Sequence, residues 1–142
     1  MNEIDLTVKA GEIHGIAGVD GNGQDYLAKI LAGILPLKKG KFLMDGKDLS
    51  KATPAERINA GLAHIPSDRH KIGMILDSSL EDNFIIAVSE QEPISHNGLL
   101  RKKEITDFSE KLVKDYDVRC ETVKQKASSL SGGNQQKLVL AR

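Results

Sequence analysis

The sequence lacks a second cysteine, an excess of charge of either sign and any long apolar run. Its one cysteine, Cys120, excludes an internal disulfide and has no cysteine or histidine neighbour at metal-site spacing, so a reducing cytoplasm is expected. Lys+Arg and Asp+Glu each total 20, so no broad positive field favours nucleic acid, and no nucleic-acid partner is expected. No apolar run approaches the roughly 20 residues that span a bilayer, so a membrane role requires a partner.

The most informative segment is residues 130–137, which read Leu-Ser-Gly-Gly-Asn-Gln-Gln-Lys. A serine and two glycines followed by helix-forming residues predict a helix start, whose first N–H groups have no partner inside the helix and carry the positive end of its dipole. The glycines let an anion such as phosphate approach the main chain closely. Ser-Gly-Gly alone also fits an ordinary capped helix after a flexible loop.

A glycine loop at residues 18–23 is the second candidate site. It follows a short apolar strand predicted at residues 13–17 and precedes a helical pattern, which is the context of a phosphate-binding loop. Gly18 and Gly23 match the two glycines of the pattern GxxxxGK(S/T). A loop that merely turns the chain is the alternative. The candidate residues are Gly18, Asp20, Gly21, Asn22, Gly23, Gln24 and Asp25.

Two positions of this loop depart from the pattern. Gln24 stands where a lysine reaches the phosphates, and a lysine about 4 Å from a phosphate oxygen contributes up to roughly 4 kcal/mol at an effective dielectric near 20. Asp25 stands where a hydroxyl holds Mg²⁺, so its carboxylate either repels the phosphates or ligates the metal as a hard oxygen donor. We therefore expect weak nucleotide binding at this loop, or none.

The remaining patterns predict a β-rich half, residues 1–78, followed by an α-rich half, residues 79–142. Strands are predicted at residues 4–8, 13–17, 42–44 and 62–65, with a turn at 45–46. Thr53 and Ser79 are predicted helix caps, Thr53 with Pro54 at the first helical position. Residues 93–98 are predicted to be a loop. An amphipathic helix of about four turns presents Ile105, Phe108, Leu112, Val113 and Tyr116 on one face.

Four segments in this order resemble the ATP-binding cassette (ABC) ATPases, in particular the second cassette of the tandem ATPases of bacterial sugar and nucleoside importers. The segments are residues 11–18 with 22–24, residues 53–57 with 60–66, residues 67–69 with 81–83, and residues 130–142. The resemblance implies an α/β fold, a partial P-loop NTPase cassette of ABC type, with ATP and Mg²⁺ as cofactors. It identifies the signature motif as Leu130, Ser131, Gly132, Gly133, Asn134 and Gln135.

The resemblance also implies how the motifs are used. In the family two cassettes dock head to tail, and each signature binds the γ-phosphate of an ATP held mainly by the other cassette. Ser67, followed by Asp68, occupies the position where active cassettes carry the Q-loop glutamine. The groups that order Mg²⁺ and the attacking water follow the signature in the family, beyond Arg142. We therefore expect a truncated cassette that has no catalytic residue of its own and is inactive alone.

The leading hypothesis is a degenerate cassette of an importer that lends its signature to a partner ATP site. The implied partners are a second cassette, transmembrane permease subunits and, indirectly, a solute-binding protein. The implied location is the cytoplasmic face of the plasma membrane. Residues 67–71 and the helix around Asn83 are the expected contact surface for the permease, although residues 67–71 also fit a solvated loop. The alternatives are a soluble ABC ATPase without a membrane partner and a non-catalytic nucleotide-binding module.

Overall fold

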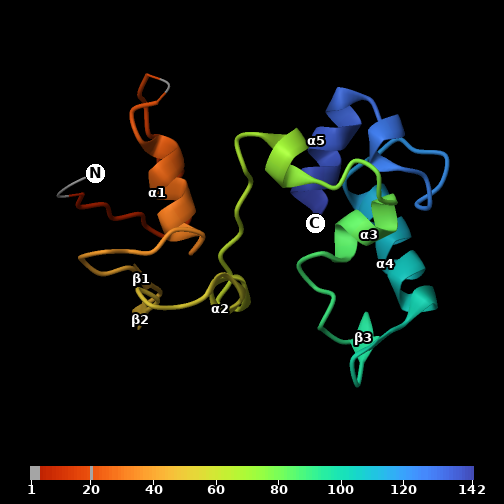
Figure 1. Cartoon of the computed structure of the whole chain (residues 1–142), viewed down its shortest axis with the longest axis horizontal. Helices are drawn as coiled ribbons and strands as arrows, with labels where there is room; N and C mark the ends of the chain where they lie inside the picture. Colours follow the sequence, from red (N-terminus) through yellow and green to blue (C-terminus); the bar gives the residue numbers. More distant parts are fainter. Residues whose placement is uncertain (1–3, 20) are drawn as a thin grey trace. The chain divides into compact units, whose positions relative to one another are not determined.

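The structure is a computed structural model that describes residues 4–19 and 21–142 (Figure 1). The chain divides into two compact units, Met1–His64 and Ile65–Arg142, called here the N-terminal unit and the C-terminal unit. The division into functional halves expected between residues 78 and 79 stays a prediction. Among the described residues, no helix has the length and apolar character needed to cross a bilayer.

The N-terminal unit holds two helices and a small hairpin. Its elements are α1 (Gln24–Leu31), β1 (Leu43–Met44), β2 (Lys47–Asp48) and α2 (Pro54–Asn59). The strands β1 and β2 pair antiparallel across a turn in which Asp45 (φ 49°) and Gly46 (φ 78°) both have left-handed backbone, as a type I′ turn requires. The predicted cap of α2 at Thr53 is confirmed. Thr53 and Glu56 form a reciprocal capping box, in which Thr53 accepts from the Glu56 N–H and the Glu56 carboxylate accepts from the Thr53 N–H.

A buried arginine, Arg57, ties this unit together although sequence reasoning did not single it out. It is only 2% exposed. Its guanidinium donates to the carbonyls of Ile30 and Leu31 at the end of α1, the latter at 2.7 Å, and its Nε donates to the Ala52 carbonyl at 3.1 Å. The guanidinium also lies 5.2 Å from the centre of the Phe42 ring. The negative end of the α1 dipole and these carbonyls together compensate the buried charge.

Three predicted strands do not form. Residues 4–8, 13–17 and 62–65 carry no strand assignment, and within the part of the chain that the structure describes they have no strand neighbour. Their apolar side chains are exposed: Ile13 is fully exposed and Ile65 is 58% exposed. A strand exists only through hydrogen bonds to a partner strand, so the alternating pattern alone was not sufficient.

The C-terminal unit is mainly helical (Figure 1). Its elements are η1 (Arg69–Gly73), α3 (Leu80–Ile85), β3 (Ser95–His96), β4 (Leu99–Leu100), α4 (Lys102–Asp115), η2 (Ala127–Ser129) and α5 (Gly132–Ala141). The predicted cap of α3 is confirmed, since Ser79 and Asp82 form a reciprocal capping box. The loop predicted at residues 93–98 is wrong in part, because β3 and β4 pair there across Asn97 and Gly98, both with positive φ.

An apolar cluster buried among α3, α4 and α5 forms the core of this unit. Leu80 and Leu138 are completely buried and Phe84 is 1% exposed. The predicted amphipathic helix is confirmed as α4, with Ile105 buried. Tyr116, predicted to share that face, instead ends the helix and is 43% exposed.

Asn83 is the polar centre of this core and is completely buried. Its side-chain amide donates to the carbonyls of Ile75 at 2.9 Å and Ser79 at 2.8 Å, and its oxygen accepts from the Ile75 N–H at 2.8 Å. Both ends of the amide are therefore used to hold the segment before α3. The contact surface expected on the helix around Asn83 stays a prediction.

Replacing Asn83 by alanine is expected to lower the free energy of unfolding by about 3 kcal/mol, because buried backbone groups at Ile75 lose their partners. Urea denaturation of the 142-residue chain measures this change. Asn83→Asp is the sharper variant, since it keeps the shape but turns an oxygen toward two carbonyls; we expect it to destabilise at least as much. A near-neutral Asn83→Asp chain would contradict this assignment.

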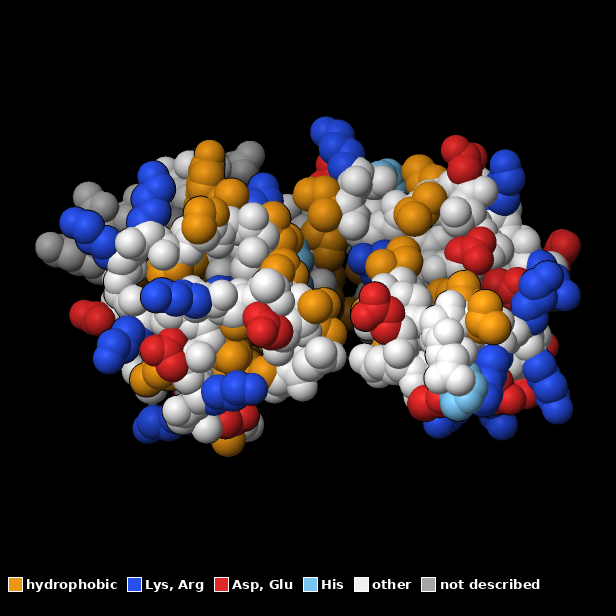
Figure 2. Space-filling view, turned by 60° about the horizontal axis from the view of Figure 1, so that its bottom comes forward, with side chains coloured by type: hydrophobic (Ala, Val, Ile, Leu, Met, Phe, Trp, Pro, Cys, Tyr) orange, Lys and Arg blue, Asp and Glu red, His pale blue; other side chains and the backbone are white. Residues whose placement is uncertain are grey.

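Charged side chains are mixed over the surface. Figure 2 shows lysine and arginine interspersed with aspartate and glutamate over both units on the visible face, with hydrophobic side chains between them. This agrees with the equal totals of basic and acidic residues.

Candidate functional site

The loop before α1 turns through two glycines with left-handed backbone. Gly21 has φ 84° and Gly23 has φ 102°, values that other residues adopt only at a cost. The Asn22 N–H donates to the Val19 carbonyl at 3.2 Å and closes the turn. Gly23 is the N-cap of α1, so the positive end of this helix meets the loop. Asp20, also predicted to belong to the site, lies outside the described residues.

The two departures from the phosphate-loop pattern have local roles in the structure. The Gln24 amide nitrogen donates to the Val19 carbonyl at 3.4 Å. The Asp25 carboxylate lies 3.1 Å from the Lys29 ammonium one turn further along α1. An acidic residue in the first turn with a lysine four residues on is favourable in any helix. A purely structural role therefore accounts for Asp25, and its binding of Mg²⁺ stays a prediction.

An open hollow of about 400 Å³ adjoins this loop. It is lined by residues 4–6, 16–18, 22–24 and Leu27. Its walls thus combine the glycine backbone with apolar side chains such as Ile4 and Ile16. Within the described ranges, 4–19 and 21–142, no group of three or more His, Cys, Asp or Glu residues is placed to hold a metal.

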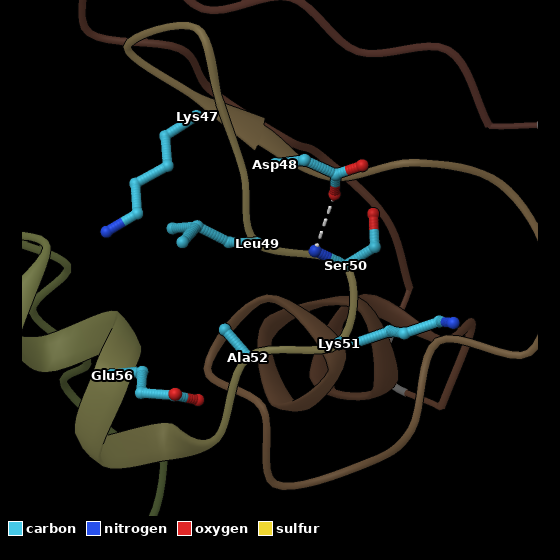
Figure 3. Close-up of a pocket in the computed structure, with 7 residues that line it drawn as sticks. All are labelled: Lys47, Asp48, Leu49, Ser50, Lys51, Ala52 and Glu56. Carbon is cyan, nitrogen blue, oxygen red and sulfur yellow. Dashed lines mark hydrogen bonds between the residues drawn. The ribbon is translucent and has the colours of Figure 1, made fainter.

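A second hollow of the N-terminal unit is shown in Figure 3. It is lined by Lys47, Asp48, Leu49, Ser50, Lys51, Ala52 and Glu56. The Asp48 carboxylate accepts from the Ser50 N–H at 2.9 Å, and the Glu56 carboxylate accepts from the Thr53 N–H at 2.7 Å. The Ser50 hydroxyl, followed by the Ser50 N–H, lowers the pKa of Asp48, and the Thr53 N–H lowers the pKa of Glu56. Because both acids serve local turns and caps, this hollow is the weaker candidate.

The predicted helix start at residue 131 is confirmed, and its tip is exposed. Ser131 is the N-cap of α5, and Ser131, Gly132 and Gly133 are all accessible. The Ser131 oxygen accepts from the Asn134 amide at 3.0 Å, and the Asn134 oxygen accepts from the Arg119 N–H at 2.9 Å. A serine oxygen that accepts one bond keeps its own O–H for donation. The tip therefore offers an oriented hydroxyl beside glycine amides.

Two other residues of the motif face the interior. Leu130 and Gln135 are each 7% exposed. The Gln135 amide donates to the Ala127 carbonyl at 3.3 Å, and its oxygen lies 3.0 Å from His70 Nε2. These two residues anchor the helix tip, while Ser131 and the two glycines stay exposed.

The segment at the Q-loop position leads into η1. The Asp68 carboxylate caps η1 by accepting from the N–H groups of Lys71 and His70, each at 3.1 Å. These bonds, the one from Lys71 foremost, hold the pKa of Asp68 below its usual range. Ser67 is exposed beside this cap. Asp68 thus fixes the backbone of this segment. Its predicted place at a nucleotide site stays a prediction.

Arg69 lies against the signature tip, which sequence spacing did not predict. A Cβ added at Gly132 would lie 3.4 Å from an Arg69 terminal nitrogen, and one at Gly73 would lie 3.4 Å from Val139. Arg69 Nε is buried and has no hydrogen-bond partner among the described residues. Together with the bond from His70 to Gln135, these contacts seat η1 along α5. No local signal reveals a contact between residues more than 60 positions apart.

Comparison with known proteins identifies the family of the chain. The family model described as ABC transporter matches residues 1–142, the whole chain. The chain belongs to the ABC transporter family. The resemblance to an ABC ATP-binding cassette is therefore confirmed, and so is the predicted α/β fold class of a partial ABC cassette.

Several curated ABC proteins are similar along the whole chain. The guanosine import ATP-binding protein NupO of Bacillus subtilis is 40% identical over 142 residues, which is 100% of this chain and 28% of that protein. The nucleoside import ATP-binding protein NupA of Lactococcus lactis is 37% identical over 98% of this chain and 28% of its own length. A ribose import ATP-binding protein, RbsA of Oceanobacillus iheyensis, is 36% identical, with coverage of 100% and 28%. The chain thus spans about a quarter of the length of these relatives.

Proposed function

We propose that this chain is part of an ATP-binding cassette of an importer for sugars or nucleosides, and that it contributes its signature tip to an ATP site completed by a partner cassette. The tip carries this proposal: Ser131, Gly132 and Gly133 are exposed at the start of α5, while Leu130 and Gln135 are buried and hold it. Aligned amides at a helix start stabilise the charge of a phosphate group.

The glycine loop of the same chain supports a division of labour between cassettes. Its backbone suits a phosphate, because Gly21 and Gly23 have positive φ and Gly23 begins α1. Its side chains suit ATP with Mg²⁺ poorly, since Gln24 brings no charge and the Asp25 carboxylate pairs with Lys29. Phosphoryl transfer depends on a cation, Mg²⁺ and an aimed water. We therefore expect this chain alone to bind ATP weakly and to hydrolyse none.

The relatives support import as the process that ATP drives, because their names describe guanosine, nucleoside and ribose import. They favour this function over the alternative of a soluble ABC ATPase without a membrane partner. The proposed partners are a second cassette, permease subunits and, indirectly, a solute-binding protein. In such an assembly the chain lies at the cytoplasmic face of the membrane, attached through the permease.

Photolabelling of the assembled importer tests the proposed sharing of the ATP site. With ATP that carries a photoreactive group on its γ-phosphate, we expect the label on the peptide that contains residues 131–133. Replacing the phosphate-loop lysine of the partner cassette by alanine should abolish this label, because that loop holds the ATP. Gln24→Ala in this chain should leave the label on the tip. Labelling of residues 18–25 alone, insensitive to the partner, would contradict the proposal.

A further inference from the structure

The side chain of Gln24 folds back over the glycine loop instead of extending away from it. A Cβ built on Gly18 would lie 1.9 Å from the Gln24 amide nitrogen and 2.9 Å from its Cδ. The amide of Gln24 therefore occupies the space directly over the Gly18 backbone. Its nitrogen also donates to the Val19 carbonyl at 3.4 Å. A side chain at position 18 would therefore displace this amide.

A phosphate loop works only if its interior is empty. Its backbone N–H groups surround the phosphate at hydrogen-bond distance, which requires that no side chain lies between them and the ligand. The hollow beside this loop is open, with Gly18, Gly23 and Gln24 among its walls. The Gln24 amide thus lies over the Gly18 backbone, where this hollow adjoins the loop.

We infer that Gln24 is an internal plug of the glycine loop, so that a phosphate group enters only when the amide swings out. This inference rests on the proposed role of the loop as a nucleotide site. It deepens that role, because the weak affinity of the loop for nucleotide then has two causes. One is the missing lysine, and the other is the Gln24 amide that lies over the loop. It also differs from a role of Gln24 as a phosphate ligand, since a ligand would strengthen binding and a plug weakens it.

The geometry favours a plug over a ligand. The amide nitrogen directs one of its two N–H groups at the Val19 carbonyl, which holds the amide against the loop backbone. The amide oxygen lies 3.6 Å from the Cβ position of Gly18, so it also faces the loop and presents a partial negative charge to an incoming anion. Both ends of the amide are therefore directed at the loop backbone.

Calorimetric titration of the 142-residue chain with pyrophosphate, and with ATP and Mg²⁺, tests the inference. We compare the unchanged chain with Gln24→Ala, Gln24→Lys and, as a control, Gln91→Ala, since Gln91 is an exposed glutamine of the other unit. A site that is open for only a fraction of the time binds with affinity reduced by that fraction, so Gln24→Ala should bind pyrophosphate about 5-fold to 20-fold more tightly. Gln24→Lys should bind more tightly still.

The outcomes test separately the Gln24 plug and the proposed role of the glycine loop as a nucleotide site. Weaker binding by Gln24→Ala would show that the amide is a ligand and would overturn the plug. Equal binding by Gln24→Ala and the unchanged chain, with tight binding by Gln24→Lys, would overturn the plug and leave the nucleotide loop standing. Failure of all variants to bind, Gln24→Lys included, would overturn both.

A nuclear magnetic resonance measurement avoids the need for a ligand. In the plugged loop the side-chain NH₂ protons of Gln24 should exchange slowly with solvent. Their chemical shifts should change in Gly18→Ala, because the added methyl group displaces the amide. The NH₂ signals of Gln91 should stay unchanged. A Gln24 signal that is typical of a solvated glutamine before and after this substitution would overturn the plug.

Discussion

Replacing Ser131 by arginine is expected to reduce ATP turnover of the assembled importer by about 100-fold or more, the loss typical when donors to a developing charge are removed. The cause lies at the tip of α5, where the Ser131 oxygen is held by Asn134 and the next two residues are glycines. An arginine side chain at this position removes the oriented hydroxyl. It also fills the space through which a phosphate approaches the amides of Gly132 and Gly133.

The control is Ser128→Arg, which adds the same side chain at an exposed position in η2. We expect this variant to retain turnover. Because Ser131 is itself exposed, both variants should keep the thermal stability of the unchanged chain to within a few degrees. Turnover that is unaffected by Ser131→Arg would refute the role proposed for the tip. Equal losses in both variants would show that added charge, and not the position, is responsible.

Replacing Arg57 by alanine is expected to lower the free energy of unfolding of the N-terminal unit by about 3 to 5 kcal/mol. Arg57 is 2% exposed and donates to the carbonyls of Ile30, Leu31 and Ala52. Its removal leaves these carbonyls without a partner and opens a cavity beside Phe42. The last turn of α1 should fray first, because the guanidinium binds two carbonyls there.

Hydrogen exchange measures this effect where it arises. The N–H groups of Ala32 and Ile34, which bond to the carbonyls of Ala28 and Lys29, should lose most of their protection in Arg57→Ala. Arg57→Lys should recover only part of it, since an ammonium group does not reproduce the planar fork of a guanidinium.

A surface arginine provides the matched control for Arg57. Arg101 is exposed and lies 3.6 Å from the Glu92 carboxylate, so Arg101→Ala should change stability by less than about 1 kcal/mol. A similarly small change in Arg57→Ala would show that this arginine does not hold the unit together.

Local chemistry was the part of the structure that sequence patterns predicted well. The caps at Thr53 and Ser79 are each closed by an acid three residues later, and both boxes form. The helix start at Ser131 was equally local. The hairpin at β3 and β4 was missed although its signal was present, because the dipeptide Asn97-Gly98 is typical of a type I′ turn.

Strands and buried polar groups were predicted poorly for a shared physical reason. The alternation at residues 4–8 indicates a strand, yet a strand needs a neighbour, and among the described residues this segment has none. The burial of the Asn83 amide against Ile75 was not predicted. No motif in the sequence indicated that Arg57 is buried. In each case the outcome depends on groups that other parts of the chain bring into contact.

The sequence by itself determined the family and the two motifs, because the order and spacing of glycines, serine and caps are properties of neighbouring residues. Only the tertiary structure decided which motif residues face outward. Ser131 is exposed while Gln135 is buried against Ala127 and His70, and Gln24 folds over Gly18. These outcomes depend on how the chain folds back on itself, and the bond between Gln135 and His70 joins residues 65 positions apart, so the pattern of neighbouring residues does not encode them.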